Sequence, residues 1–236
     1  MRVAVVGADG FVGTALCAEL ERRADVQLVR VRRADYDAVR TSHTFDIVVN
    51  AAMPSRRFAA RKNPAHDFEQ TVATTSRILY DFSSAKIVQI SSVSARSQLD
   101  TVYGRHKRAA EVLADNGRNL VVRLGPLYDP ALSKGVIIDL LRGQPVYCSA
   151  QSRYAFTPLG WAARRIADSF DKLRILEIGA RSSVRLGDLA AHLNSLSTFS
   201  GAVDDQIFAD APNDAPAAEA VKGFIAKWRE TVESTA

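Results

Sequence analysis

The chain has 236 residues, of which 47% are hydrophobic and 24% charged, and it carries a formal net charge of +5. This length suits one large domain or a core domain with a small appendage. The composition is that of a globular protein with a buried core, and no run of 18 apolar residues suggests a membrane span. The segment Met1–Gly7 does not resemble a secretory signal, because its apolar stretch is short and runs directly into a glycine.

The cysteines and the basic residues limit the partners we expect. Cys17 and Cys148 lie far apart and in no metal-ligand spacing, so we expect two buried thiols in a reducing compartment and no metal site. Residues 22–62 hold ten Lys and Arg against four Asp and Glu, which would suit phosphate groups. The chain shows no stripe of interleaved aromatic residues and no helix-turn-helix pattern. We therefore expect a cytoplasmic protein with no nucleic-acid or membrane partner.

Short apolar runs alternate with amphipathic segments through the first half of the chain. We expect strands over Arg2–Val6, Val26–Val31, Ile47–Asn50, Ile87–Ser91 and Leu120–Leu124. We expect helices over Phe11–Arg23, from Pro64 (with Asn63 as its cap) to about Phe82, and over Tyr103–Ala114. Because the strands are apolar almost throughout, this alternation predicts a parallel sheet covered on both faces.

The second half predicts a less regular structure. Helices are expected over Ser133–Arg142, Pro158–Phe170, Leu186–Leu193 and Ala217–Val232, and strands over Pro145–Ser149 and Arg174–Ile178. The stretch Ser197–Pro216 is rich in Ser, Asp, Ala and Pro, which predicts a loop.

A glycine-rich turn follows the first expected strand and opens the first expected helix. It reads Gly7-Ala8-Asp9-Gly10-Phe11-Val12-Gly13, a G-x-x-G-x-x-G spacing. The first glycine of such a turn allows a tight bend, the second lets the backbone approach a pyrophosphate, and the third lets helix and strand pack closely. The helix N-terminus then faces the phosphates. We therefore assign Gly7, Asp9, Gly10, Phe11, Val12 and Gly13 to a dinucleotide site.

Two arginines at the end of the second strand bear on which dinucleotide binds. An acidic residue at this place would bind the adenosine ribose of NAD, but the chain has Arg32 and Arg33. Arginine suits the 2′-phosphate of NADP. We therefore expect NADP as the cofactor, and NAD is the alternative because Asp35 and Asp37 follow. The two arginines could equally belong to a solvated basic turn that binds no cofactor.

Further segments, in chain order, resemble the extended short-chain dehydrogenase/reductase family, the NAD(P)-dependent epimerase/dehydratase group. They are Asp46–Ala52, Ile90–Ser92, the Y-x-x-x-K of Tyr103–Lys107, Arg123–Pro130, Arg153–Phe156, and Glu177–Gly179 with Val184–Ala190. With the glycine turn, the resemblance covers most of residues 1–195. It implies an α/β fold, a Rossmann doubly wound parallel sheet with a reduced C-terminal substrate lobe. Residues 1–130 would form the NAD(P)-binding core. Residues 131–236 would form the small lobe, interleaved with the end of the sheet and a C-terminal helix.

The resemblance also implies a Ser–Tyr–Lys site. Tyr103 and Lys107 lie four residues apart and share a helix face. A tyrosine has a pKa of about 10, so proton exchange at neutral pH needs the phenolate favoured by about 4 kcal/mol, which an ammonium and a positive nicotinamide ring can supply. Ser92 would bind and orient the substrate oxygen, and Lys107 would also bind the nicotinamide ribose. Asn50, Ala51, Ala52, Met53 and Pro126 would complete the cofactor site.

For several other side chains the sequence allows both a functional and a structural role. Ser91 is the alternative to Ser92 as the catalytic serine, although side chains alternate along a strand and these two therefore point to opposite faces. His66 and His106 are candidate acids or structural residues. The basic segment Ser55–Lys62 would bind a substrate diphosphate or form a solvated loop, and Arg153 would bind substrate or lie on the surface.

Three departures from the family pattern shape the expected function. Thr71 stands where the family commonly has asparagine, and the spacing from Ser92 to Tyr103 is short. Val93-Ser94 replaces the acidic pair of 4,6-dehydratases, which disfavours dehydration. We expect an NAD(P)-dependent reductase or epimerase that acts on a carbonyl or hydroxyl of a nucleotide sugar or related small molecule, with 4-keto reduction favoured.

The alternative is a catalytically silent dinucleotide-binding sensor or regulator. Many relatives also pair through two long helices, which here would be Pro64–Phe82 and Tyr103–Ala114, so a homodimer is expected.

Overall fold

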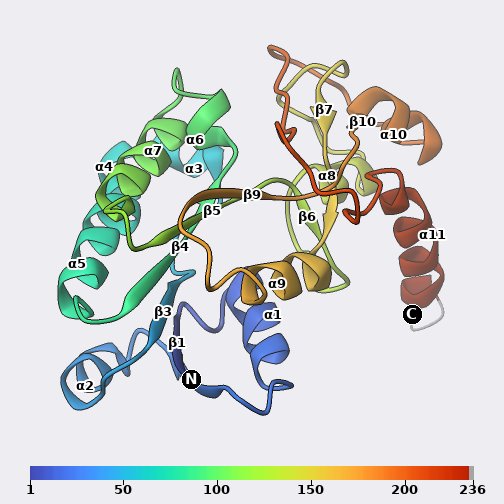
Figure 1. Cartoon of the computed structure of the whole chain (residues 1–236). Coiled ribbons are helices and arrows are strands. Elements are labelled where there is room, and N and C mark those ends of the chain that lie inside the picture. Colours follow the sequence, from blue (N-terminus) through green and yellow to red (C-terminus); the bar gives the residue numbers. More distant parts are fainter. Residues whose placement is uncertain (234–236) are drawn as a thin grey trace. The chain divides into compact units, whose positions relative to one another are not determined.

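The computed structural model describes residues 1–233 and contains two compact units (Figure 1). Unit 1 comprises Met1–Leu124 and Gly160–Ile178, and unit 2 comprises Gly125–Leu159 and the chain from Gly179 onward. Within the described residues, every helix is too short or too polar to cross a lipid bilayer.

Unit 1 is built on a six-stranded sheet in the order β2-β1-β3-β4-β5-β9, with every neighbouring pair parallel. The strands are β1 (Arg2–Val6), β2 (Gln27–Val31), β3 (Ile47–Asn50), β4 (Lys86–Ser92), β5 (Leu120–Leu124) and β9 (Arg174–Ile178). The strand order reverses between β1 and β3, and such sheets bind ligands at this reversal, beyond the carboxyl ends of the strands. The predicted doubly wound parallel sheet is confirmed.

Helices cover both faces of this sheet (Figure 1). One face carries α1 (Phe11–Leu20) and α9 (Leu159–Ala167), and beyond the ends of these helices Arg23 donates to Asp168 at 2.6 Å. The other carries α4 (Pro64–Phe68), the π-helical turn η1 (Glu69–Ala73), α5 (Thr74–Asp81) and α7 (Val102–Ala114). The predicted helix from Pro64 to about Phe82 is confirmed as the run α4–η1–α5.

One hydrophobic cluster of unit 1 forms where the apolar strands meet α5. Its buried members include Ala4, Val6, Val31, Val48, Ile78, Phe82 and Ile87. Burying one such large side chain contributes about 1.5–3 kcal/mol. Three short helices of this unit were not predicted, namely α2 (Tyr36–Ser42), α3 (Arg57–Lys62) and α6 (Ser94–Ser97).

Unit 2 has a core of its own and little regular sheet. Two short ladders pair β6 (Leu127–Tyr128) with β8 (Thr157–Pro158), and β7 (Arg153–Tyr154) with β10 (Val184–Arg185). Its helices are α8 (Val136–Leu141), α10 (Leu186–His192) and α11 (Ala220–Glu233). The core is centred on Phe156, Leu186, Leu189, Val221 and Ile225.

The strand predicted over Pro145–Ser149 is wrong. Val146 makes only an isolated bridge with Phe199, and Val146 and Cys148 are buried in the core of unit 2. An apolar run becomes a strand only where a partner strand lies alongside it, and here the pairing extends over a single residue.

Candidate active site

Two glycines of the Gly7–Gly13 turn are required by backbone packing. Gly7 has φ +82°, and a Cβ there would lie 2.7 Å from Cα of Ala52, just beyond β3. A Cβ on Gly13 would lie 2.1 Å from the carbonyl oxygen of Gly7. The turn and the end of β3 therefore touch directly, at the strand-order reversal.

Gly10 differs from these two glycines. Its backbone has φ −76° and ψ 165°, which any residue adopts, and it is exposed. A Cβ there would meet only the Gly7 carbonyl oxygen, at 3.2 Å. Gly10 also begins α1 without a side-chain cap. The protein alone gives little reason for a glycine here, but a pyrophosphate approaching the start of α1 would need the space that a side chain would fill.

Buried side-chain amide groups hold the segment that follows β3 in place. Asn50 is fully buried, and its Nδ2 donates to Oε1 of Gln89 on β4 at 2.9 Å. The N–H of Ala52 donates to Oδ1 of Asn50 at 3.2 Å, and Nε2 of Gln89 contacts the sulfur of Met53. These bonds fix Ala51–Met53, so Asn50 acts on this loop from within the core.

The two arginines after β2 have different partners. Arg32 forms a 3.0 Å ion pair with Asp9 of the glycine turn, and both side chains are more than half exposed. Arg33 donates to Gln70 at 3.4 Å. The guanidinium of Arg32 therefore lies beside the glycine turn and is shared with a carboxylate.

Ser92, Tyr103 and Lys107 come together at the carboxyl end of β4. Tyr103 and Lys107 lie on α7 and are only 6% and 3% exposed, and Nζ of Lys107 lies 5.2 Å from the centre of the Tyr103 ring. The Ser92 side chain lies close enough to Tyr103 to act on the pKa of its hydroxyl. Ser92 Oγ also accepts from the N–H of Ser94 at 3.2 Å.

Burial sets the charge of the two helical residues. It raises the pKa of Tyr103 to about 12, while the Ser92 hydroxyl and the positive charge of Arg57 act to lower this pKa and Asp67 acts to raise it. Burial lowers the pKa of Lys107 to about 7, against the opposing effects of Asp67 and Glu111. Without cofactor, Tyr103 therefore keeps its proton at neutral pH. The prediction that Lys107 lowers this pKa stays a prediction for the cofactor-bound protein.

Gly104 explains how the short chain between Ser92 and Tyr103 closes. The segment makes the single turn α6 and then packs on α7. A Cβ on Gly104 would lie 2.0 Å from the carbonyl oxygen of Gln98 and 2.8 Å from that of Ser94. Only glycine lets this turn approach the helix so closely, which places Tyr103 within reach of Ser92. The sequence interpretation missed this residue.

Gly104→Ala should therefore destabilise the protein by about 1–3 kcal/mol and also lower turnover, because overpacking must push α6 away from α7. Urea unfolding measures the first effect and steady-state kinetics the second. Gly160→Ala is the matched control, since a Cβ on Gly160 of α9 meets nothing within 4 Å. Equal stability of the two variants would contradict the role of Gly104.

A buried charge network lies further along α7. Glu111 is fully buried and accepts from Arg123 of β5 at 2.6 and 2.8 Å. Ser91 donates to the same carboxylate at 2.7 Å. This bond gives Ser91 a structural partner. Glu111 was also missed, although its place four residues after Lys107 puts it on the same helix face.

The other side chains that the sequence suggested as acids or as cofactor or substrate contacts do not lie together. His66 is exposed on α4 and His106 bonds Asp67 at 2.7 Å. Arg153 is held by Asp205, with Nε of Arg153 3.0 Å from the carboxylate, and Pro126 accepts from Thr157 through its carbonyl oxygen. Both belong to unit 2, and their cofactor and substrate roles stay predictions.

Thr71, in η1, is fully buried, and its hydroxyl has no hydrogen-bond partner among the described residues.

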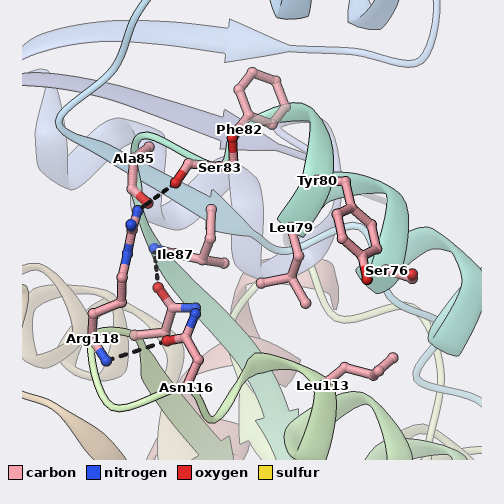
Figure 2. Close-up of a pocket in the computed structure, with 11 residues that line it drawn as sticks. Ser76, Leu79, Tyr80, Phe82, Ser83, Ala85, Ile87, Leu113, Asn116 and Arg118 are labelled. Atoms are coloured by element: carbon pink, nitrogen blue, oxygen red, sulfur yellow. Dashed lines mark hydrogen bonds between the residues drawn. The ribbon is translucent and has the colours of Figure 1, made fainter.

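A separate cavity of about 250 Å³ lies at the opposite end of the strands (Figure 2). It is lined from α5 by Ser76, Leu79 and Tyr80, and from the segment just before β5 by Arg118 and Asn119. Arg118 donates to the carbonyl oxygen of Ser83 at 2.8 Å, and Asn119 accepts from the N–H of Ile87 at 2.9 Å. None of the predicted site residues lines it.

Residues 3–120, half of the chain, match the NAD dependent epimerase/dehydratase family. The chain belongs to this family. Epimerase/dehydratase proteins are NAD(P)-dependent enzymes. The sequence of this family member matches none of the curated proteins with which it was compared.

Solved structures share the fold of this epimerase/dehydratase protein at low sequence identity. The dTDP-4-dehydrorhamnose reductase of Clostridium acetobutylicum is 14% identical, with a TM-score of 0.79 over 97% of this chain and 100% of that chain. The UDP-glucose 4-epimerase of Thermotoga maritima, solved with UDP-glucose, is 16% identical, with a TM-score of 0.77 over 98% and 100%. The dTDP-4-dehydrorhamnose reductase of Bacillus anthracis, solved with NADP, is 16% identical, with a TM-score of 0.75 over 96% and 98%.

Proposed function

We propose that the protein is an NADP-dependent reductase of a carbonyl group on a nucleotide sugar, with a 4-keto sugar as the favoured substrate. The observation that carries this proposal is that Ser92, at the carboxyl end of β4, lies close to the buried Tyr103, with Lys107 over the tyrosine ring. A catalytically silent protein would have no need of this arrangement.

The residues present fit a dinucleotide. Gly10 leaves open the space that a pyrophosphate would take, the uncapped start of α1 would donate to it, and Ala51–Met53 would lie under the cofactor. Lys107 would hold the nicotinamide ribose. When bound, NADPH would supply the hydride. Arg32 would bind the 2′-phosphate, in competition with Asp9.

The protonation state of Tyr103 favours reduction. A phenol whose pKa lies at about 12 keeps its proton at Oη and can donate it to a carbonyl oxygen as that oxygen gains negative charge. Ser92 would donate to the same substrate oxygen and orient it. An epimerase would need Tyr103 first to take a proton from a hydroxyl group, which a raised pKa opposes.

The substrate class rests on the relatives and on the basic segment of α3. The Thermotoga maritima relative was solved with UDP-glucose. The positive charge of Arg57 on α3 acts to lower the pKa of Tyr103, and its guanidinium donates to Gln98, ahead of α7, at 3.4 Å. A guanidinium there suits a substrate phosphate. Arg153, which the sequence predicts to bind substrate, stays a candidate contact.

Oxidation of NADPH in the presence of a panel of nucleotide 4-keto sugars tests this proposal. Turnover with one of them, and its loss in Tyr103→Phe, is the expected result. Dinucleotide binding without turnover on any carbonyl substrate would instead favour the sensor or regulator.

Arg32→Asp should shift the preference from NADPH towards NADH. Hydrogen bonds to charged groups contribute about 1.5–3 kcal/mol, so NADPH affinity should fall roughly tenfold to a hundredfold. Calorimetric titration of both cofactors measures this. Arg22→Asp, which changes an exposed arginine at the end of α1, should leave the ratio unchanged. Equal affinities of the wild type for NADPH and NADH would refute the assignment of Arg32.

We also propose a homodimer that pairs through α5 and α7. Tyr80 on α5 and Val112 and Leu113 on α7 are exposed apolar residues. Association would remove this apolar surface from water. Sedimentation equilibrium of the full chain should give twice the mass of 25.7 kDa.

A further inference from the structure

Three polar side chains form a row across neighbouring strands of the unit 1 sheet. Ser91 of β4 is in register with Arg123 of β5, and Arg123 is in register with Glu177 of β9. Nη1 of Arg123 lies 3.5 Å from Oε1 of Glu177, so these two side chains share one face of the sheet. We call these three residues the polar row. It lies one position before Ser92, at the carboxyl end of the sheet.

Two charged side chains from helices bind the polar row. Glu111 of α7 accepts from Nε and Nη2 of Arg123 at 2.8 and 2.6 Å, and from Ser91 at 2.7 Å. Arg96 of α6 donates from Nε and Nη2 to the two carboxylate oxygens of Glu177, at 2.8 and 3.1 Å. Both ion pairs are bidentate, and such pairs fix the orientation of the two partners as well as their distance. The polar row therefore fastens α6 and α7 to the same place on the sheet.

These two helices hold the three residues of the proposed catalytic site. Tyr103 and Lys107 belong to α7, and Glu111 lies about one turn after Lys107. The N–H of Ser94, the first residue of α6, donates to Oγ of Ser92 at 3.2 Å. A shift of α6 against α7 would therefore move the Ser92 hydroxyl relative to Tyr103.

The burial of this network suits a role in positioning. The side chains of Arg123 and Glu177 are only 9% and 12% exposed, and that of Arg96 is 37% exposed. Removing ions from water costs about as much free energy as their pairing returns, so buried ion pairs add little net stability, but they can fix the arrangement of the elements that they join. Glu177 is the member that binds an arginine of α6 and an arginine of β5 together.

We propose that Glu177 is a positioning residue, which holds α6 in place against α7 by binding Arg96 and Arg123 together. This inference rests on the proposed function, because the site that Glu177 positions is the one assigned to proton transfer. Without the carboxylate of Glu177, α6 would lose its ionic link to the sheet. Arg123 would keep its bonds to Glu111, so α7 would stay anchored.

Glu177→Gln tests this role without cofactor or substrate. The variant keeps the size of the side chain and removes its charge, and Arg123 stays paired, so we expect the protein to fold. The full chain, which has six tyrosines, is labelled with ¹³C at the tyrosine Cζ, and the Tyr103 resonance is assigned from Tyr103→Phe. In Glu177→Gln this resonance should shift or broaden, because Cζ senses the surroundings of the hydroxyl. The other tyrosine resonances should stay in place.

Asp188→Asn is the matched control, because it removes the charge from a bidentate pair with Arg185 in unit 2. It should leave the Tyr103 resonance unchanged. An unchanged Tyr103 resonance in folded Glu177→Gln would overturn the proposal, and so would a shift of all the tyrosine resonances, which indicates general damage. If Glu177→Gln fails to fold, Arg96→Gln breaks the same link at its more exposed partner, and the same resonance decides.

Turnover separates this inference from the proposed function. If both hold, Glu177→Gln should lower kcat about tenfold to a hundredfold, since a misplacement of about 1 Å can have an effect of this size. KM and NADPH affinity should change little, because α7 stays anchored. In a Tyr103→Phe background the same change should lower kcat by a smaller factor, because the proton donor is already gone. An equal factor in both backgrounds would indicate structural damage and overturn the proposal.

The two ideas can also fail separately. If no carbonyl substrate is turned over but the Tyr103 resonance alone shifts in Glu177→Gln, the proposed function fails and the positioning role of Glu177 stands. If the wild type turns over a keto sugar and Glu177→Gln does so at the same rate, the proposed function stands and the role of Glu177 is refuted.

Discussion

Tyr103→Phe should lower turnover by about two to four orders of magnitude, which is the usual contribution of a general acid. The substitution removes one hydroxyl and almost no volume. The tyrosine ring is buried on α7 beside Nζ of Lys107, and a phenylalanine ring fills the same space. The fold and NADPH affinity should therefore survive, so that the loss falls on the proton transfer alone.

The measurement compares single-turnover rates and NADPH affinity in the wild type and the variant. Tyr147→Phe, at a tyrosine that is 79% exposed in unit 2, is the matched control and should keep full activity. Turnover retained in Tyr103→Phe would assign the proton transfer to another group. A parallel loss of NADPH affinity would show that the change reaches beyond the proton.

Gly10→Val should abolish dinucleotide binding while the protein stays folded. The backbone of Gly10 is compatible with a side chain, the glycine is exposed, and an added Cβ would meet only the carbonyl oxygen of Gly7, at 3.2 Å, so we expect the variant to fold with a small local shift. The branched side chain would instead occupy the space in front of α1 where the pyrophosphate is expected. Because the phosphates provide the main anchor at such a helix terminus, their exclusion should remove binding altogether.

Calorimetry with NADPH measures this loss, and circular dichroism verifies the fold. Gly160→Val, at a site with nothing within 4 Å of an added Cβ, is the matched control for adding a branched side chain near a helix start. Unchanged NADPH affinity in folded Gly10→Val would place the dinucleotide elsewhere on the molecule.

The sheet could be predicted from the sequence because its signals are local. The runs Arg2–Val6, Ile47–Asn50, Leu120–Leu124 and Arg174–Ile178 match their strands residue for residue, since an apolar run bounded by polar residues defines its own ends. The run over Pro145–Ser149 looks the same locally. The prediction of a strand there was wrong because only the tertiary fold decides whether a partner strand lies alongside.

The main groups of the candidate site could be predicted, but their supporting residues could not. Ser92, Tyr103 and Lys107 lie in a spacing that is visible along the chain, and the structure brings them together. Asp67 and Glu111 look like solvated charges on helices. Their partners, His106 and Arg123, lie 39 and 12 residues away, so only the folded chain reveals their burial.

The order of the strands has a consequence for how the chain is made. β5 lies between β4 and β9, but β9 is synthesised only after Gly125–Leu159, a stretch that belongs to unit 2. Until β9 emerges from the ribosome, the apolar β5 is an open sheet edge, which can pair with other nascent chains. Unit 1 therefore cannot complete its sheet before the first part of unit 2 has been translated. A fragment that ends at Leu124 would retain the glycine turn and β4 and would carry this edge permanently.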